Sequence, residues 1–137
     1  MSKQFSDLGI SAPLVKAITD LKIVVPTEIQ QKTIPLLLSN TTDLVGLAKT
    51  GTGKTAAFGL PLLQLTDPNS ATIQAVILVP TRELGQQIFR NLEDFAKYLP
   101  EVSIVALTIH EDEEYFFKML EAGASGYVPK RAAPEEL

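Results

Sequence analysis

Cysteine and tryptophan are absent from this chain, and His110 is its single histidine. Without cysteine there can be no disulfide and no thiolate metal site, and one histidine cannot complete a zinc site by itself. No stretch resembles a signal peptide, and none is apolar over the roughly 18 residues that a membrane span requires. These absences predict a cytoplasmic-type, soluble protein without a membrane partner.

Positive charge becomes scarce toward the C-terminal end. Residues 1–100 contain 9 Lys/Arg and 8 Asp/Glu, whereas residues 101–137 contain 3 and 8, so a net charge of +1 is followed by −5. An acidic section is not expected to contact nucleic acid. The chain has 137 residues, 45% of them apolar, which predicts one globular domain with a buried core. The change in charge near residue 100 also suggests that the two sections have different histories.

Apolar runs with strand-like and helix-like spacing alternate along the chain. The expected strands are residues 43–47, 74–79, 102–107 and 126–129. The expected helices lie within residues 5–21, 28–38, 54–65, 82–98 and 112–122, with a last turn in 132–137. In the first of these helices Ser11 is the expected N-cap and Pro13 lies in the first turn. The second is expected to be capped by Thr27 and kinked or shortened at Pro35, and the helix at 112–122 to end at Gly123. This order predicts an α/β three-layer sandwich with a mainly parallel sheet of about four strands, whose spatial order stays open.

A glycine-rich loop separates the first predicted strand from the helix that follows it. It comprises Ala48, Lys49, Thr50, Gly51, Thr52, Gly53, Lys54 and Thr55. Its glycines let several backbone N–H groups converge, and the helix N-terminus adds unpaired N–H groups and a positive dipole end. Lys54 is expected to reach the β and γ phosphates and Thr55 to ligate Mg²⁺, so ATP or ADP with Mg²⁺ is the expected ligand. The alternative is a loop that merely turns, since Ala48 replaces the first glycine of the strict pattern.

This loop and two other motifs resemble those of the DEAD-box RNA helicases. The loop looks like motif I, Pro80-Thr81-Arg82-Glu83-Leu84 looks like motif Ia, and Pro26-Thr27-Glu28-Ile29-Gln30 looks like the end of the Q motif. One departure is Lys22, where the family usually has glycine. The resemblance covers residues 1 to about 100 and implies a P-loop NTPase-like half-domain.

The resemblance also implies roles for individual residues. Gln30 would read the adenine edge with its amide, and Phe5 would stack on the base. Pro80, Thr81 and Arg82, at a helix start, would contact RNA backbone phosphates. Plainer alternatives stay open: Phe5 as a core aromatic, Gln30 as a helix-surface amide, and Arg82 as the ion-pair partner of Glu83 or Asp94.

The Asp-Glu-Ala-Asp tetrad of the family does not occur in these 137 residues. An ATPase of this class needs such acids to position Mg²⁺ and the attacking water. The cluster Glu111-Asp112-Glu113-Glu114 is better explained as the acidic first turn of a helix. We therefore expect no catalytic residue, no useful ATP hydrolysis and no RNA unwinding.

The last section resembles a different family. Residues 101–137, with Gly123-Ala124-Ser125-Gly126-Tyr127 followed by Lys130, are similar to the fourth strand, fourth helix and fifth strand of a response-regulator receiver, a flavodoxin-like domain. Thr108 and Lys130 match its switch threonine and phosphate-pairing lysine, but the strands that would bring the phosphoacceptor aspartate are absent. Thr108 and Lys130 are thus better explained as a strand-end hydroxyl and a solvated lysine.

Together the two resemblances predict an engineered chimera, joined within residues 99–107. It would bind ATP or ADP weakly, with weak or no RNA binding and no phosphoreceiver activity, as a monomer or as a homodimer formed by sheet-edge pairing or swapping. One alternative is a DEAD-box RNA helicase fragment with residual ATPase and RNA binding. Another is a phospho-signalling receiver module.

Overall fold

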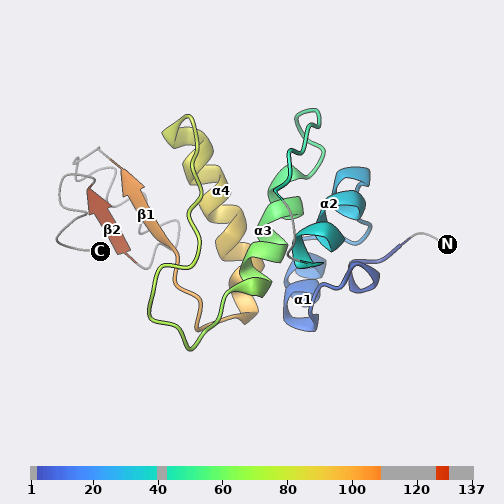
Figure 1. Ribbon diagram of the computed structural model, residues 1–137, viewed down its shortest axis with the longest axis horizontal. Coiled ribbons are helices and arrows are strands. Elements are labelled where there is room, and N and C mark those ends of the chain that lie inside the picture. Colours follow the sequence, from blue (N-terminus) through green and yellow to red (C-terminus); the bar gives the residue numbers. More distant parts are fainter. Residues whose placement is uncertain (1–2, 40–42, 109–125, 130–137) are drawn as a thin grey trace. The chain divides into compact units, whose positions relative to one another are not determined.

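The computed structural model describes residues 3–39, 43–108 and 126–129, and these are mostly helical (Figure 1). Two compact units are present: residues 1–76 with 94–102, and residues 77–93 with 103–137. The elements in chain order are η1 (Ser6–Leu8), α1 (Ala12–Asp20), α2 (Glu28–Ser39), α3 (Lys54–Leu65), α4 (Arg82–Phe95), η2 (Ala96–Tyr98), β1 (Val105–Thr108) and β2 (Gly126–Pro129).

The first unit has a core built from α1, α2 and α3. Leu14 and Ile18 of α1, Ile34 of α2 and Leu60 of α3 are each 0% exposed. Full burial of such a side chain contributes about 1.5–3 kcal/mol. Helices α2 and α3 pack directly against each other, so the glycine-rich loop that leads into α3 is held close to the start of α2.

Most predicted helices are confirmed. Helix α1 begins after Ser11 with a proline in its first turn, and α3 has the predicted bounds. Helix α2 runs on to Ser39 and so is not shortened at Pro35, whereas the other predicted outcome, a kink at Pro35, stays a prediction. A proline removes only its own N–H from the helix, and the residues after it keep theirs. The helix predicted at 82–98 is α-helical to Phe95 and then tightens into η2.

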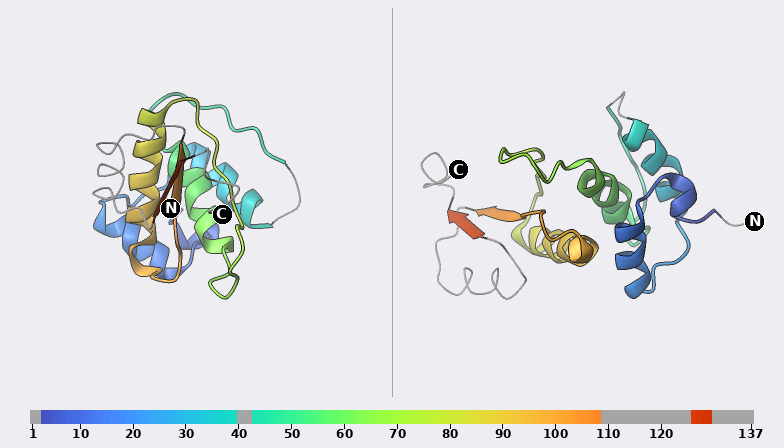
Figure 2. Two further views of the ribbon diagram at one scale, coloured as in Figure 1. Left: turned by 90° about the vertical axis from the view of Figure 1, so that its left-hand side faces the viewer. Right: turned by 90° about the horizontal axis from the view of Figure 1, so that it is seen from below.

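The second unit contains a parallel strand pair, which Figure 2 shows side by side. Val105 pairs with Gly126 at one end of the register and Thr108 with Pro129 at the other. The strand predicted at 126–129 is confirmed, and the one predicted at 102–107 is found at Val105–Thr108. The parallel direction is also confirmed for this pair.

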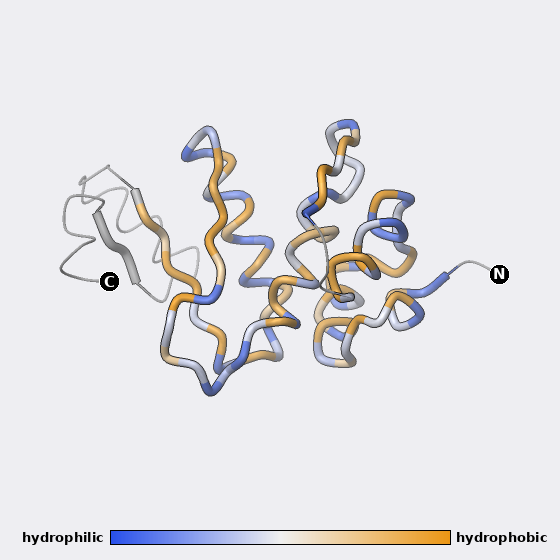
Figure 3. Tube along the Cα trace, viewed as in Figure 1, coloured by the Kyte–Doolittle hydropathy of each residue, from blue (hydrophilic) through white to orange (hydrophobic). Residues whose placement is uncertain are grey.

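The prediction of a four-stranded sheet is wrong for the described residues. Residues 43–47 and 74–79 have no strand assignment and join no hydrogen-bonded ladder within them. Their apolar side chains are open to solvent, with Val45 87% and Leu78 90% exposed, and Figure 3 colours both segments as hydrophobic. An apolar run becomes a strand only when another strand supplies hydrogen-bond partners, and the described residues supply none here.

Several predicted features lie outside the described residues: the helix at 112–122, Gly123 and the final turn at 132–137. None of the helices in the described ranges has both the length and the apolar composition needed to cross a bilayer.

Candidate functional site

The glycine-rich loop lies in the first unit, between residues 43–47 and α3. Gly51 and Gly53 adopt φ angles of 80° and 81°, in the left-handed region that glycine reaches without steric cost. Gly53 is also the N-cap of α3, whose first residue is Lys54. The two glycines thus turn the chain so that the loop wraps back over the start of the helix.

This loop presents free hydrogen-bond donors. No backbone N–H of residues 49–56 donates a hydrogen bond within the described part of the chain, and residue 57 is the first to do so, to the carbonyl of Gly53. Unpaired N–H groups that converge at the N-terminus of a twelve-residue helix form a favourable site for an anion. The donor set therefore fits a phosphate group.

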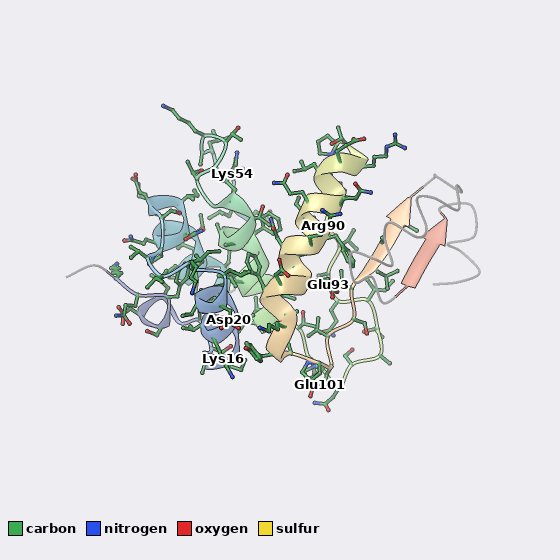
Figure 4. The ribbon with its side chains drawn as sticks, turned by 180° about the vertical axis from the view of Figure 1, so that it is seen from behind. Lys16, Asp20, Lys54, Arg90, Glu93 and Glu101 are labelled. Carbon is green, nitrogen blue, oxygen red and sulfur yellow. The ribbon has the colours of Figure 1, made fainter. Side chains whose placement is uncertain are left out.

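Lys54 is folded back over the loop that precedes it. Its Nζ donates to the carbonyl of Ala48 at 2.7 Å, and the hydroxyl of Thr52 donates to the carbonyl of Lys49 at 2.6 Å. The Lys54 side chain is labelled at the start of α3 in Figure 4. A bound phosphate would offer this ammonium a charged acceptor in place of a neutral carbonyl, and charge-assisted hydrogen bonds are about twice as strong.

Gln30 of α2 braces the same loop from the protein interior. Its Nε2 donates to the carbonyl of Gly53 at 3.0 Å, while its Oε1 accepts from the N–H of Thr27 at 2.9 Å. Gln30 is only 2% exposed. A Cβ added at Gly53 would lie 2.2 Å from Gln30 Nε2, so glycine is required there for close approach as well as for its backbone angle.

Thr27 is a contact residue whose role sequence reasoning missed. We expected it to cap α2, but its hydroxyl donates to the carbonyl of Thr52 at 2.8 Å. The spacing Thr-x-x-Gln offered a signal, because in a capping box the fourth residue reaches back to the N–H of the first, as Gln30 does here. Together Thr27 and Gln30 tie the start of α2 to two consecutive carbonyls of the loop.

Phe5 is 2% exposed and belongs to the apolar core of the first unit. Its carbonyl accepts hydrogen bonds from the N–H groups of Leu8 and Ile10. The core position agrees with the plainer of the two sequence interpretations. Stacking of Phe5 on an adenine base stays a prediction, as does base reading by Gln30.

A cavity of about 560 Å³ opens between the start of α2 and the loop. It is lined by Thr27, Glu28, Ile29, Lys32, Leu47, Ala48, Lys49, Gly51 and Thr52. At its rim Lys32 Nζ contacts Glu28 Oε1 at 2.6 Å, and this hydrogen bond lowers the pKa of Glu28 below its ordinary value. The cavity has the size of a small-molecule site, and both Lys32 of α2 and Lys49 of the loop line it.

The predicted RNA contacts Pro80, Thr81 and Arg82 lie in the second unit, at the start of α4. Thr81 Oγ1 accepts from the N–H of Leu84 at 3.3 Å, so Thr81 acts as an N-cap. Arg82 Nε contacts Glu83 Oε1 at 3.1 Å, as the alternative interpretation predicted. RNA binding by these three residues stays a prediction.

The sequence singled out three further candidates: Thr108, Lys130 and the acidic cluster 111–114. Thr108 ends β1, whereas Lys130 and the acidic cluster 111–114 lie outside the described residues. In the described part of the chain, no group of three or more His, Asp or Glu side chains is arranged to hold a metal ion. Thr55 is the second residue of α3, and its ligation of a phosphate-bound Mg²⁺ stays a prediction.

A glycine loop that runs into a helix whose first two residues are lysine and threonine is typical of P-loop nucleotide-binding proteins. The family model described as DEAD/DEAH box helicase matches residues 27–124. The chain therefore belongs to the DEAD/DEAH box helicase family.

Curated relatives and solved structures agree with this assignment. ATP-dependent RNA helicase DeaD of Escherichia coli is 48% identical over 103 residues, 75% of this chain and 16% of the relative. DEAD-box ATP-dependent RNA helicase CshA of Bacillus subtilis is 47% identical over 105 residues, 73% of this chain and 21% of the relative. The chain thus spans about a fifth or less of these relatives.

Among solved structures, Saccharomyces cerevisiae Dbp5 bound to RNA and ADP-BeF3 matches with a TM-score of 0.77 at 28% identity, covering 98% of this chain and 35% of that one. A DEAD box protein from Methanococcus jannaschii matches with a TM-score of 0.71 at 32% identity, covering 94% and 35%. These likenesses show a RecA-like P-loop NTPase fold.

Nothing in these comparisons supports a receiver origin for residues 101–137 or an engineered chimera. The helicase match continues to residue 124, well beyond the junction predicted within residues 99–107. The alternative interpretation, a part of a DEAD-box helicase, has the better support.

Proposed function

We propose that this chain binds Mg²⁺-ATP or Mg²⁺-ADP at residues 48–55 and is the nucleotide-binding segment of an ATP-dependent RNA helicase. The observation that carries the proposal is the set of unpaired backbone N–H groups at residues 49–56, gathered at the N-terminus of α3 beside Lys54. Such a set favours an anion with several acceptor oxygens. Membership of the helicase family supplies the class of anion, a nucleoside phosphate.

Each loop residue has a distinct part in this proposal. Lys54 gives up the Ala48 carbonyl and pairs with the β and γ phosphates, while the Thr55 hydroxyl ligates the Mg²⁺ that the nucleotide carries. The metal neutralises phosphate charge, and the residues of this chain bind and orient. Thr27 and Gln30 hold the loop open from the interior by fixing the carbonyls of Thr52 and Gly53.

For the 137 residues by themselves, we propose binding without turnover. The tetrad that positions Mg²⁺ and water in this family does not occur in the sequence. Contact with RNA through Thr81 and Arg82 is proposed as weak, because the Arg82 guanidinium already contacts Glu83 and the whole chain carries a net charge of −4.

Isothermal titration calorimetry with Mg²⁺-ADP tests the binding proposal. Lys54→Ala should raise the Kd by roughly 10- to 100-fold, since a hydrogen bond to a charged group contributes about 1.5–3 kcal/mol. Lys97→Ala, which removes a lysine remote from the loop, is the matched control and should bind like the parent. Equal heats from the parent and Lys54→Ala would refute the proposal.

The same titration with Mg²⁺-GDP tests the part proposed for Gln30. If the Gln30 amide reads adenine, Gln30→Ala should reduce the preference for ADP over GDP. If Gln30→Ala weakens ADP and GDP binding by the same factor, so that the preference for ADP is unchanged, then Gln30 only supports the loop and does not read the base.

A further inference from the structure

Side chains hold four carbonyl groups of the glycine-rich loop, namely those of residues 48, 49, 52 and 53. In a planar trans peptide the carbonyl and the following N–H point in opposite directions. Side chains that hold these carbonyls therefore help to keep the loop N–H groups on the other side, where no described residue accepts from them. Three of the donors, Thr27, Gln30 and Lys54, lie outside residues 49–52, and the fourth is Thr52 itself.

Thr52 closes the turn at residues 49–52 with its side chain. Residues 50 and 51 lie in a tight turn, and Thr52 is half-buried. Such a turn is often closed by the N–H of its fourth residue, which donates to the carbonyl of its first. Here the Thr52 hydroxyl donates to the Lys49 carbonyl at 2.6 Å, and the Thr52 N–H donates no hydrogen bond within the described part of the chain. The side chain thus takes the place of the backbone donor.

From this arrangement we infer that Thr52 is a positioning residue for the nucleotide phosphates. The hydroxyl and the N–H of Thr52 compete for one carbonyl oxygen, and as long as the hydroxyl occupies it the N–H stays available to a phosphate oxygen. The inference rests on the proposed nucleotide binding, and it concerns a side chain that need not touch the nucleotide itself.

The Thr52 hydroxyl and the Lys54 ammonium differ in what happens to them when a phosphate binds. Lys54 exchanges the neutral carbonyl of Ala48 for a charged acceptor, whereas the Thr52 hydroxyl is a neutral donor and keeps its bond. The Thr27 hydroxyl, which donates to the Thr52 carbonyl at 2.8 Å, fixes the same residue from the start of α2. Among the described contacts, the N–H is therefore the one polar group of Thr52 that is left for a ligand.

Amide hydrogen exchange on the full 137-residue chain tests whether this N–H is free. In the ligand-free parent the amide of residue 52 should be unprotected, and saturating Mg²⁺-ADP should slow its exchange by roughly tenfold or more. Thr52→Val has nearly the same shape but lacks the hydroxyl, so the N–H of residue 52 should take over the Lys49 carbonyl. Without any ligand, its amide should then be roughly fivefold better protected than in the parent, after correction for intrinsic rates.

Titration with Mg²⁺-ADP measures the consequence for binding. Thr52→Val should raise the Kd about tenfold, since one N–H is withdrawn from a charged acceptor. Thr52→Ser keeps a hydroxyl and should resemble the parent in both measurements. Thr66→Val is the matched control: it removes a hydroxyl that donates to the Leu62 carbonyl at 2.9 Å, at the other end of α3, and it should leave the Kd unchanged.

An amide of residue 52 that is already protected in the ligand-free parent would overturn the inference, and this result does not depend on how any variant folds. So would a Thr52→Val variant with the Kd or the amide protection of the parent, or a Thr52→Ser variant that binds as weakly as Thr52→Val. A parent that binds no Mg²⁺-ADP would instead refute the proposed function, and the inference with it.

Discussion

Gly51 and Gly53 have nearly the same backbone angle but different surroundings. A Cβ at Gly53 would lie 2.2 Å from Gln30 Nε2, whereas a Cβ at Gly51 would meet nothing within 4 Å. An alanine with positive φ has about the same unfavourable backbone energy at either position. Any difference between the two alanine variants therefore measures how tightly Gln30 is packed against the loop.

We expect Gly53→Ala to destabilise the protein by about 1–3 kcal/mol more than Gly51→Ala, because it displaces a buried amide that satisfies two backbone groups. Urea denaturation of both variants measures this difference. In the background of Gln30→Ala the difference should shrink, as expected for residues in direct contact. Equal destabilisation by the two alanines would show that Gln30 does not contact the loop.

Lys22 is the one described residue other than glycine with positive φ, at 64°. It follows α1, and the N–H of Ile23 donates to the carbonyl of Ile18, the six-residue bond of a Schellman motif. That position favours glycine, and a lysine there is under backbone strain. The sequence signalled this site, since the family usually has glycine where this chain has Lys22.

Replacing Lys22 with glycine should therefore stabilise the protein, by about 0.5–1 kcal/mol. For a chain of this size the melting temperature should rise by about 2–5 °C. Lys22→Ala removes the same charge but keeps a Cβ, and it should leave the melting temperature nearly unchanged. If Lys22→Ala stabilises the protein as much as Lys22→Gly, the effect comes from removal of the lysine charge and not from relief of backbone strain.

At the scale of elements, α1 and η2 are joined by a cluster of polar side chains. Asp20 Oδ2 accepts from Lys97 Nζ at 2.8 Å and from the Tyr98 hydroxyl at 2.7 Å, and Lys16 Nζ lies 4.3 Å from the centre of the Tyr98 ring. Figure 4 shows Lys16 and Asp20 near each other on α1. The hydrogen bonds from Lys97 and Tyr98 lower the pKa of Asp20, and Asp20 raises the pKa of Lys97.

These shifts predict a pH window for the contact between α1 and η2. A lowered pKa for Asp20 means that its stabilising effect is present above about pH 4, the ordinary aspartate pKa, and is lost as the pH falls through the lowered value. The raised pKa of Lys97 means that its effect is present below about pH 10 and is lost as the pH rises through the raised value.

We accordingly expect Asp20→Asn to lower the melting temperature at neutral pH and to have no effect in strong acid, where the parent carboxylate is protonated. The effect at neutral pH should be small, because the pair is exposed and screened by solvent. Melting curves from acid to neutral pH measure it. An Asp20→Asn deficit that persists unchanged in strong acid would contradict the ion-pair explanation.

Helices could be predicted from the sequence more reliably than strands. Helix α3 is specified locally, by Gly53 at its start and by apolar residues such as Leu60 and Leu63 that reach its core face. Residues 43–47 and 74–79 have equally clear apolar patterns, but a strand also depends on a partner elsewhere in space. The apolar pattern of each segment predicted a strand, but a pattern within one segment carries no information about whether another segment pairs with it. No described residue pairs with either one.

For the candidate site, the sequence predicted the loop residues but not the contacts that other elements make with them. The loop residues were found because their glycines, lysine and threonine occur at fixed offsets. The positions of Phe5 and Gln30 were not, since burial and hydrogen-bond partners depend on how α2 packs beside the loop. Thr27 was taken as an ordinary helix cap because its bond to Thr52 joins residues 25 positions apart in the chain.

At the scale of the whole molecule, two resemblances suggested two origins, and the comparisons support one. The helicase match runs through residue 124, and the Dbp5 structure covers 98% of the chain. The change in net charge near residue 100 lies within the matched residues 27–124. Composition alone therefore could not locate a junction, and the prediction of one within residues 99–107 gains no support.

The central claim is that the free N–H groups of the loop at residues 48–55 bind the phosphates of a nucleotide. A backbone amide NMR titration measures this directly. With Mg²⁺-ADP the amide signals of Gly51, Gly53 and Lys54 should shift, and with adenosine, which has no phosphate, they should stay in place. Shifts of these three signals that are the same with adenosine as with ADP, or that are absent with both, would contradict the account.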